Sequence, residues 1–233
     1  METKEFNVIR TAWDFTQKSA SWIRRELSVT GLRTWKELKG ESCISIEELP
    51  HKQSICTSRS FPGIGLDKLK DMEEAISNFA ASCSKKLRKS HIACRNMTVF
   101  AYTSRFRGDI PGDYLSFSYT FLVATNDLQE IVSATMKGLK VHWKGDGKYF
   151  YKKAGVLVWD ICRENEIQGN LFDTIDREKQ RKLMETIDGI NRENGHDAIR
   201  VASQGYSRNW HLKNVHLSLH YTTNWEELIR LKV

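Results

Sequence analysis

The stretch YLSFSYTF, residues 114–121, alternates apolar or aromatic side chains with hydroxyl-bearing ones along most of its length. Alternation with a period of two predicts a β-strand that buries one face and exposes the other. Residues 95–105, just before it, have the composition of a second strand. The two strands together predict a sheet with one apolar face and one face rich in hydroxyl groups.

Two helical patterns and two further strands complete this central region. Apolar residues recur every three to four positions in both helical patterns, and Asp67 is the expected N-cap of the first. The predicted helices cover residues 67–90 and 127–143, and the predicted strands cover residues 52–61, 95–105, 114–121 and 148–162. This β-α-β-β-α-β order predicts an α+β fold with a ferredoxin-like split β-α-β arrangement. Two helices would cover one face of the sheet and leave the other face open.

The flanking segments have different patterns. The first 51 residues show the apolar spacing of short helices, punctuated by Gly31 and Gly40, and we expect a helix to stop at Gly40, before an acidic tether. A small α+β unit is expected at the C-terminal end, with a helix over residues 177–193 and short extended pieces at 199–201 and 217–221. The predicted divisions are residues 1–51 (helical piece and tether), 52–162 (sheet domain), 163–176 (linker) and 177–233 (small terminal domain).

The net charge of +7 is concentrated in one part of the chain. Residues 52–108 hold 11 Lys and Arg against 4 Asp and Glu, which equals the whole surplus. A local basic surplus among hydroxyl-bearing and aromatic residues is typical of a surface that faces phosphates. The alternative is that the basic cluster at residues 85–89 is only the solvated end of a helix.

Several classes of protein are disfavoured by the composition. The five cysteines contain no C-x-x-C pair, so neither a disulfide framework nor a zinc knuckle is indicated, and we expect reduced thiols. The seven histidines do not cluster at metal-ligand spacing, and no phosphate-loop, zinc-protease or serine-hydrolase motif is present. No apolar run has the length of a membrane span, so we expect no membrane partner and a cytoplasmic protein.

Three motifs resemble those of one known family. The stretch KQSICTSRSF, residues 52–61, resembles the strand that opens the little-finger domain of UmuC-type Y-family translesion DNA polymerases. KKAGV, residues 152–156, resembles the last strand of that domain. HLS at 216–218 and YTT at 221–223 resemble the small domain that ends UmuC-type chains, although Leu219 stands where that family more usually has proline.

The resemblance implies a DNA-binding role for the sheet domain. The little finger holds duplex DNA through sugar and phosphate contacts, which position the template without reading its sequence. Arg59 is the leading candidate, because a planar guanidinium can pair with two phosphate oxygens. The candidate DNA-binding residues are Lys52, Arg59, Ser60, Arg95, Arg105, Lys148, Lys152 and Lys153. For Arg105 the alternative of a solvated loop charge stays open.

A short peptide in the linker resembles a second known element. QGNLF, residues 168–172, is similar to the bacterial sliding-clamp-binding peptide, in which a glutamine bonds at the rim of a cleft and a Leu-Phe pair fills an apolar pocket. This resemblance implies clamp binding through Gln168, Asn170, Leu171 and Phe172. The alternative is an ordinary linker whose Leu171 and Phe172 pack on the small terminal domain.

No catalytic residues and no cofactor are expected in this chain. Polymerase chemistry needs carboxylates that converge on two metal ions, and SIEE at residues 45–48 lacks a neighbouring acidic strand. The resemblance implies that the palm, the fingers and most of the thumb, with their Mg²⁺ site, would precede Met1. We therefore expect either a C-terminal fragment or a natural truncated gene product.

The expected role is to support synthesis past damaged bases during the SOS response, on damaged or primer-template duplex DNA in the bacterial nucleoid. A processed UmuD-like dimer is a further expected partner, since UmuC-like polymerases work with one. Two alternatives stay open at this point. One is a stand-alone module for RNA, although the sheet lacks the basic-glycine-aromatic pattern of an RRM. The other is a protein-interaction scaffold that uses residues 177–233.

Overall fold

The computed structural model describes residues 9–43, 52–195, 197–206, 208–212 and 217–228. The SIEE stretch at 45–48, the tether residues up to Pro50, and His216 of the terminal motif lie outside the described residues. The chain divides into two compact units, Met1–His51 and Lys52–Val233, which are described separately.

The first unit is helical. It contains α1 (Ala12–Thr16) and α2 (Ala20–Leu38), and a capping box of Thr11 and Asp14 begins α1. Gly40 ends α2 as expected, since its φ of +88° is a left-handed conformation that glycine adopts without strain. Gly31 does not interrupt α2, because the non-helical residue inside this helix is Ser28, three positions earlier.

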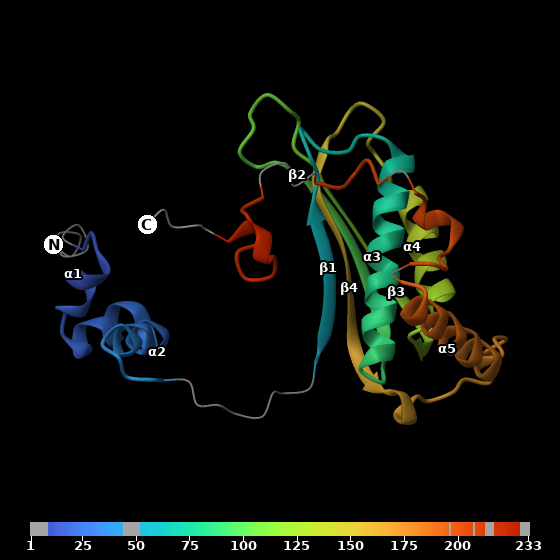
Figure 1. Ribbon diagram of the computed structural model, residues 1–233, viewed down its shortest axis with the longest axis horizontal. Helices are drawn as coiled ribbons and strands as arrows, with labels where there is room; N and C mark the ends of the chain where they lie inside the picture. Colours follow the sequence, from blue (N-terminus) through green and yellow to red (C-terminus); the bar gives the residue numbers. More distant parts are fainter. Residues whose placement is uncertain (1–8, 44–51, 196, 207, 213–216, 229–233) are drawn as a thin grey trace. The chain divides into compact units, whose positions relative to one another are not determined.

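The second unit is built on a four-stranded antiparallel sheet (Figure 1). Its strands are β1 (Ser54–Ser60), β2 (Ile92–Thr103), β3 (Tyr114–Thr125) and β4 (Tyr151–Arg163). Their lateral order is β1-β4-β2-β3, so β4 separates β1 from β2, and β2 separates β3 from β4. Both β-α-β units are therefore split, and the α+β fold and its β-α-β-β-α-β order are confirmed.

Two helices cover one face of the sheet, as expected. They are α3 (Leu69–Lys89) and α4 (Leu128–His142), which Figure 1 shows on the same side of the strands. Their apolar stripes and the inward-facing strand residues form one core, in which Ile76, Leu87 and Val99 are fully buried. Burial of this apolar area supplies most of the stabilisation of the unit.

The predicted start of α3 needs one correction. Asp67 is not the N-cap, because that position belongs to Lys68, which makes no side-chain capping bond. The carbonyl oxygen of Asp67 instead accepts a hydrogen bond of 2.6 Å from the backbone N–H of Asp146. This bond joins the turn before β4 to the start of α3.

The part of the C-terminal segment up to Trp210 packs on the outer side of α3. The whole segment contains α5 (Arg177–Glu193) and the single 3-10 turns η3 (Ala202–Gln204) and η4 (Trp225–Glu227), and η2 (Glu164–Glu166) follows β4. Among the described residues of 177–233 there is no strand, so the expected extended pieces do not join a sheet. Val201 does have extended backbone angles, but it serves as the N-cap of η3.

Trp210 anchors this segment to α3. Its indole is 3% exposed and meets the ring of Phe79 edge to face, with centroids 5.4 Å apart. The indole N–H donates to a carboxylate oxygen of Glu74 at 3.2 Å, and the backbone N–H of Arg208 donates to the same oxygen at 2.8 Å. Buried hydrogen bonds of this kind fix the segment in one register on the helix.

Candidate nucleic-acid interface

The sheet face opposite α3 and α4 carries four rows of side chains, one row for each register position. The rows, read from β1 across β4 and β2 to β3, are Ser54–Trp159–Asn96–Thr120, Cys56–Leu157–Thr98–Ser118, Ser58–Gly155–Phe100–Ser116 and Ser60–Lys153–Tyr102–Tyr114. We call these sixteen positions the open face. Hydroxyl-bearing residues dominate it, as the alternation in residues 114–121 predicted.

Hydrogen bonds between neighbouring strands order several of these polar groups. Thr98 and Ser118 share a bond of 2.8 Å between hydroxyl oxygens, and the indole N–H of Trp159 donates to Thr98 at 3.1 Å. The hydroxyl of Thr120 donates to Asn96 at 2.7 Å. Thr120 and one member of the Thr98–Ser118 pair use their single proton within the sheet, so the remaining hydroxyl groups of the open face are the ones free to donate to the sugar and phosphate oxygens of a nucleic-acid backbone without reading the bases.

Gly155 makes room for an aromatic pair in the middle of the open face. A Cβ atom at this position would lie 2.6 Å from the ring of Phe100 and 2.5 Å from Cβ of Ser58. Phe100 in turn stacks on Tyr102, with centroids 6.4 Å apart and ring planes 13° apart. The glycine of the KKAGV motif therefore lets the Phe100 ring come close to the backbone of the neighbouring strand.

The predicted DNA-binding residues fall into two groups. Ser60 and Lys153 lie opposite each other on the open face, in the row nearest the β2–β3 loop. Lys153 is the one basic residue among the sixteen positions. Four more candidates lie around the sheet: Lys52 before β1, Arg95 at the β-bulge of β2, Arg105 in the β2–β3 loop, and Lys148 before β4. All four are exposed.

Arg59 and Lys152 lie on the helix-covered side instead. Ile55, Thr57 and Arg59 share one face of β1, and Ile55 is buried beneath α3. Thr57 accepts a hydrogen bond of 3.1 Å from the ammonium group of Lys86 on α3. The ammonium group of Lys152 donates to the backbone carbonyls of Phe61 at 2.6 Å and Gly63 at 2.8 Å. Lys152 therefore ties β4 to the turn after β1.

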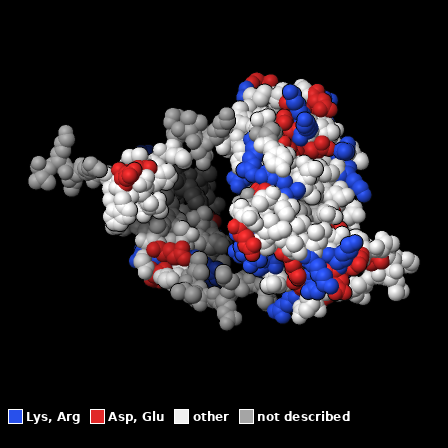
Figure 2. Space-filling model, turned by 45° about the vertical axis from the view of Figure 1, so that its right-hand side comes forward, with Lys and Arg blue, Asp and Glu red and all other residues white. Residues whose placement is uncertain are grey.

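Most of the local basic surplus lies on or beside α3 rather than on the open face. Of the basic cluster at the end of this helix, Arg88 donates to both carboxylate oxygens of Asp188 on α5, at 2.6 and 2.9 Å. Figure 2 brings the helix-covered side forward and shows its Lys and Arg side chains interspersed with Asp and Glu. Charge composition alone therefore did not locate the face that carries the hydroxyl rows.

The peptide that resembles a clamp-binding motif is exposed in the loop between η2 and α5. Leu171 is 100% exposed and Phe172 is 82% exposed, so neither packs on the terminal segment. The side chain of Asn170 accepts a bond of 2.9 Å from the backbone N–H of Phe172, which holds a local turn. Gln168 is also exposed. All four predicted residues are therefore accessible to a partner.

Both ends of this loop are fixed to the β3–α4 junction. On one side, the side-chain amide of Asn126 donates to the carboxylate of Glu164 at 2.6 Å. On the other side, Arg177 donates to Glu130 at 2.6 Å and to Asp173 at 2.7 Å. The guanidinium of Arg177 also holds the pKa of Asp173 below its ordinary value.

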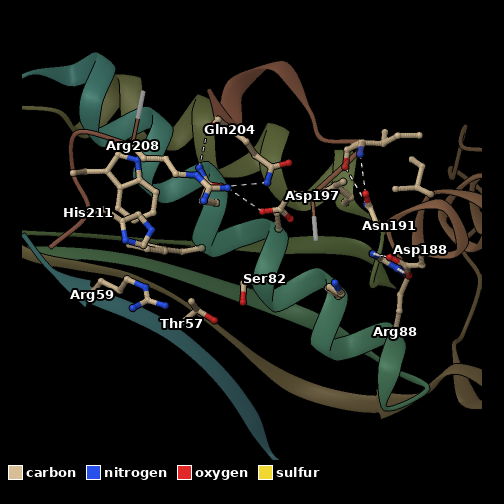
Figure 3. Close-up of a pocket in the computed structure, with 18 residues that line it drawn as sticks. Thr57, Arg59, Ser82, Arg88, Asp188, Asn191, Asp197, Gln204, Arg208 and His211 are labelled. Atoms are coloured by element: carbon tan, nitrogen blue, oxygen red, sulfur yellow. Dashed lines mark hydrogen bonds and ion pairs between the residues drawn. The ribbon is translucent and has the colours of Figure 1, made fainter. Parts of the chain in front are cut away.

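A pocket of about 340 Å³ lies between β1, α3 and the C-terminal segment (Figure 3). Arg59 and Thr57 line it from β1, Ser82 and Lys85 from α3, and His211 from the C-terminal segment. Burial lowers the pKa of His211, and the positive charges of Arg59 and Arg208 lower it further. Two positive charges therefore lie close to the imidazole.

Two features that would indicate other classes of site are absent from the described residues. In that part of the chain, no group of three or more His, Cys, Asp or Glu side chains is arranged to hold a metal ion. None of the described helices has the length and apolar character needed to traverse a bilayer.

The sheet unit matches one family by sequence. The impB/mucB/samB family C-terminal domain matches residues 52–171, which include all four strands, both covering helices and most of the exposed loop peptide. The chain belongs to the impB/mucB/samB family. A second match covers residues 181–231, with a domain of unknown function (DUF4113).

Curated members of the impB/mucB/samB family are similar along nearly all of this chain. Protein UmuC of Salmonella typhimurium is 38% identical over 226 residues, which are 96% of this chain and 53% of that protein. Protein ImpB of Salmonella typhimurium is 36% identical over 94% of this chain and 51% of its own length. Protein MucB of Escherichia coli is 35% identical over the same shares of the two chains. This chain spans about half the length of these relatives, and it is a UmuC-type C-terminal region, as the motifs predicted.

Sequence reasoning missed the residues that join Arg59 in the pocket. Lys85, Arg208 and His211 come from segments far apart in the chain, and no local motif connects them. One signal was available for Arg59 itself. It is four residues after the apolar Ile55, so strand alternation alone places it on the buried side of β1.

Proposed function

We propose that this chain is the non-catalytic, DNA-binding part of a UmuC-like translesion DNA polymerase. The open face of the sheet would hold the backbone of primer-template duplex, and the loop peptide at 168–172 would dock on the sliding clamp. The observation that carries the proposal is the hydroxyl-lined open face on the C-terminal domain of this family. This DNA-bound role would place the protein on the bacterial chromosome during the SOS response.

The open face suits contact with a backbone of any sequence. Serine and threonine hydroxyls can donate to phosphate oxygens, and Lys153 adds a charge in the row of Ser60. Five basic candidates lie on or around this face: Lys52, Arg95, Arg105, Lys148 and Lys153. If each neutralises one phosphate, the salt dependence of log K has a slope of at most about −4.5.

The test is fluorescence anisotropy of a labelled primer-template duplex at several salt concentrations. We expect Lys153→Ala to weaken binding equally on duplexes of different sequence and to reduce the slope by about 0.9. Lys137→Ala is the matched control, because Lys137 is exposed on α4, which covers the other face. Equal effects of the two variants, or a loss that depends on sequence, would contradict backbone contact by the open face. Tighter binding to single-stranded RNA than to duplex would favour an RNA-binding module instead.

Clamp docking has a separate test. Replacement of Leu171 and Phe172 by alanine removes two fully accessible apolar side chains, so clamp binding should be lost while duplex affinity stays unchanged. Val141→Ala on α4 is a control, because it removes an apolar side chain that is 79% exposed elsewhere. Unchanged clamp affinity in the double variant would show that the peptide is an ordinary linker.

The remaining parts of the proposal concern the polymerase core and a further protein partner. The carboxylates and Mg²⁺ ions of polymerase chemistry would belong to a palm domain, and this chain would contribute binding of the duplex and of protein partners. The terminal segment is a candidate docking surface for a processed UmuD-like dimer. A pull-down of that dimer with and without residues 177–233 would test this role.

A further inference from the structure

The pocket between β1, α3 and the C-terminal segment lies apart from the open face. Arg59 points into it from the helix-covered side of β1, and Figure 3 shows His211 next to Arg59, with Thr57 on the same strand. Ser82 and Lys85 line it from α3. Three separate parts of the chain therefore direct hydrogen-bond donors toward one space.

The carboxylates that line this pocket already have basic partners. Asp188 accepts both of its hydrogen bonds from Arg88, and Asp197 lies 3.4 Å from the guanidinium of Arg208. Within the described part of the chain, neither Arg59 nor Lys85 has an ion-pair partner. The pocket therefore keeps two positive charges that no acidic side chain among the described residues neutralises.

The interior of the pocket is partly apolar. Phe79, Ile187 and Trp210 line it together with the charged groups. A space of about 340 Å³ is within the range of small-ligand sites, which combine apolar walls with a few convergent polar groups. An occupant with one anionic end and one flat or apolar end, such as a nucleotide, fits these walls.

We propose that this pocket binds a phosphate group, with Arg59 and Lys85 as its charged ligands and Thr57 and Ser82 as neutral hydrogen-bond donors. Guanidinium and ammonium groups form their strongest hydrogen bonds with such oxyanions. The site goes beyond the proposed function, because it lies off the open face that is proposed to hold the duplex. The phosphate comes either from a free nucleotide or from a nucleic-acid strand that passes the β1 edge.

The experiment uses the full chain with inorganic phosphate, a deoxynucleoside monophosphate and a primer-template duplex as three separate probes. Titrations are followed by calorimetry at constant ionic strength and by NMR of the His211 ring. An anion beside this imidazole favours its protonated form, so phosphate binding should raise the pKa of His211. Arg59→Gln and Lys85→Gln should each weaken binding at least about tenfold. Lys89→Gln is the matched control, since Lys89 is exposed on the same helix but does not line the pocket.

The two sources of phosphate give different results. If the free nucleotide binds and loses affinity in both variants while duplex affinity is unchanged, the ligand is a free nucleotide. If only duplex affinity falls in both variants, the ligand is a phosphate of the strand. The proposal is overturned if no probe loses affinity in the two variants. It is also overturned if a hexaglutamate peptide, which offers carboxylates in place of phosphate, binds the pocket more tightly than phosphate and nucleotide do. Lys153→Ala, measured on the same duplex, reports separately on the open face.

Discussion

Replacement of Trp210 by alanine should release the C-terminal segment from α3. The indole is 3% exposed, and an aromatic side chain of this size buries up to about 250 Å², which corresponds to at most about 6 kcal/mol. Alanine also leaves a cavity beside Phe79 and removes the N–H that donates to Glu74. We expect the free energy of unfolding to fall by about 3–5 kcal/mol, the usual range for Trp→Ala in a core.

Urea unfolding followed by circular dichroism measures this loss, and limited proteolysis shows where the chain opens. Because the segment meets the sheet domain mainly through α3, we expect new cleavage within residues 177–212 before the sheet itself unfolds. Trp225→Ala is the matched control, since Trp225 is 88% exposed and its loss should change stability by less than about 0.5 kcal/mol. A cost below about 1 kcal/mol for Trp210→Ala, without new cleavage, would refute the anchoring role.

Two further predictions concern a turn and an ion pair. Gly65→Ala should lower stability by more than about 2 kcal/mol in thermal or urea unfolding, because φ is +122° and a Cβ would lie 2.5 Å from the carbonyl oxygen of Tyr151. Gly63→Ala, with φ of +56° and no atom within 4 Å, should cost only about 1 kcal/mol, and equal costs would refute the steric explanation. Asp173→Asn should lower stability at neutral pH, where the carboxylate is charged and bonded to Arg177. Since the folded pKa of Asp173 is lowered, this contribution is present above the unfolded pKa and lost as pH falls through the folded one, so urea midpoints of variant and parent should converge in acid.

The sequence predicted the order of the elements and a split β-α-β arrangement, but not which strands are central. Alternation in residues 114–121 and helical spacing in 127–143 reflect burial against neighbours, which is local information. Which strand lies beside which depends on chain crossings that no local pattern records. The central position of β2 and β4 therefore came only from the structure.

Only part of the candidate site could be predicted, because local patterns do not record which distant segments meet. The motifs lie on β1 and β4, but Arg59 and Lys152 were chosen by residue type, and their position in the alternation was not used. Lys153 faces the open side, whereas Lys152 donates to backbone carbonyls on the other side. The pocket around Arg59 also needs His211, which is brought near by the anchoring of Trp210 more than 150 residues along the chain.

The fixed ends of the loop at residues 167–172 limit how far a partner bound to this loop can lie from the sheet. Six residues span at most about 20 Å when fully extended, and both ends return to the β3–α4 junction through Asn126 and Arg177. A partner that holds Leu171 and Phe172 would therefore keep the sheet within a short, nearly constant distance. The local concentration of the open face at the partner would be high, and the geometry would allow few orientations. Such a loop acts as a short spacer, unlike a long flexible tether that would let the domain search a wide volume.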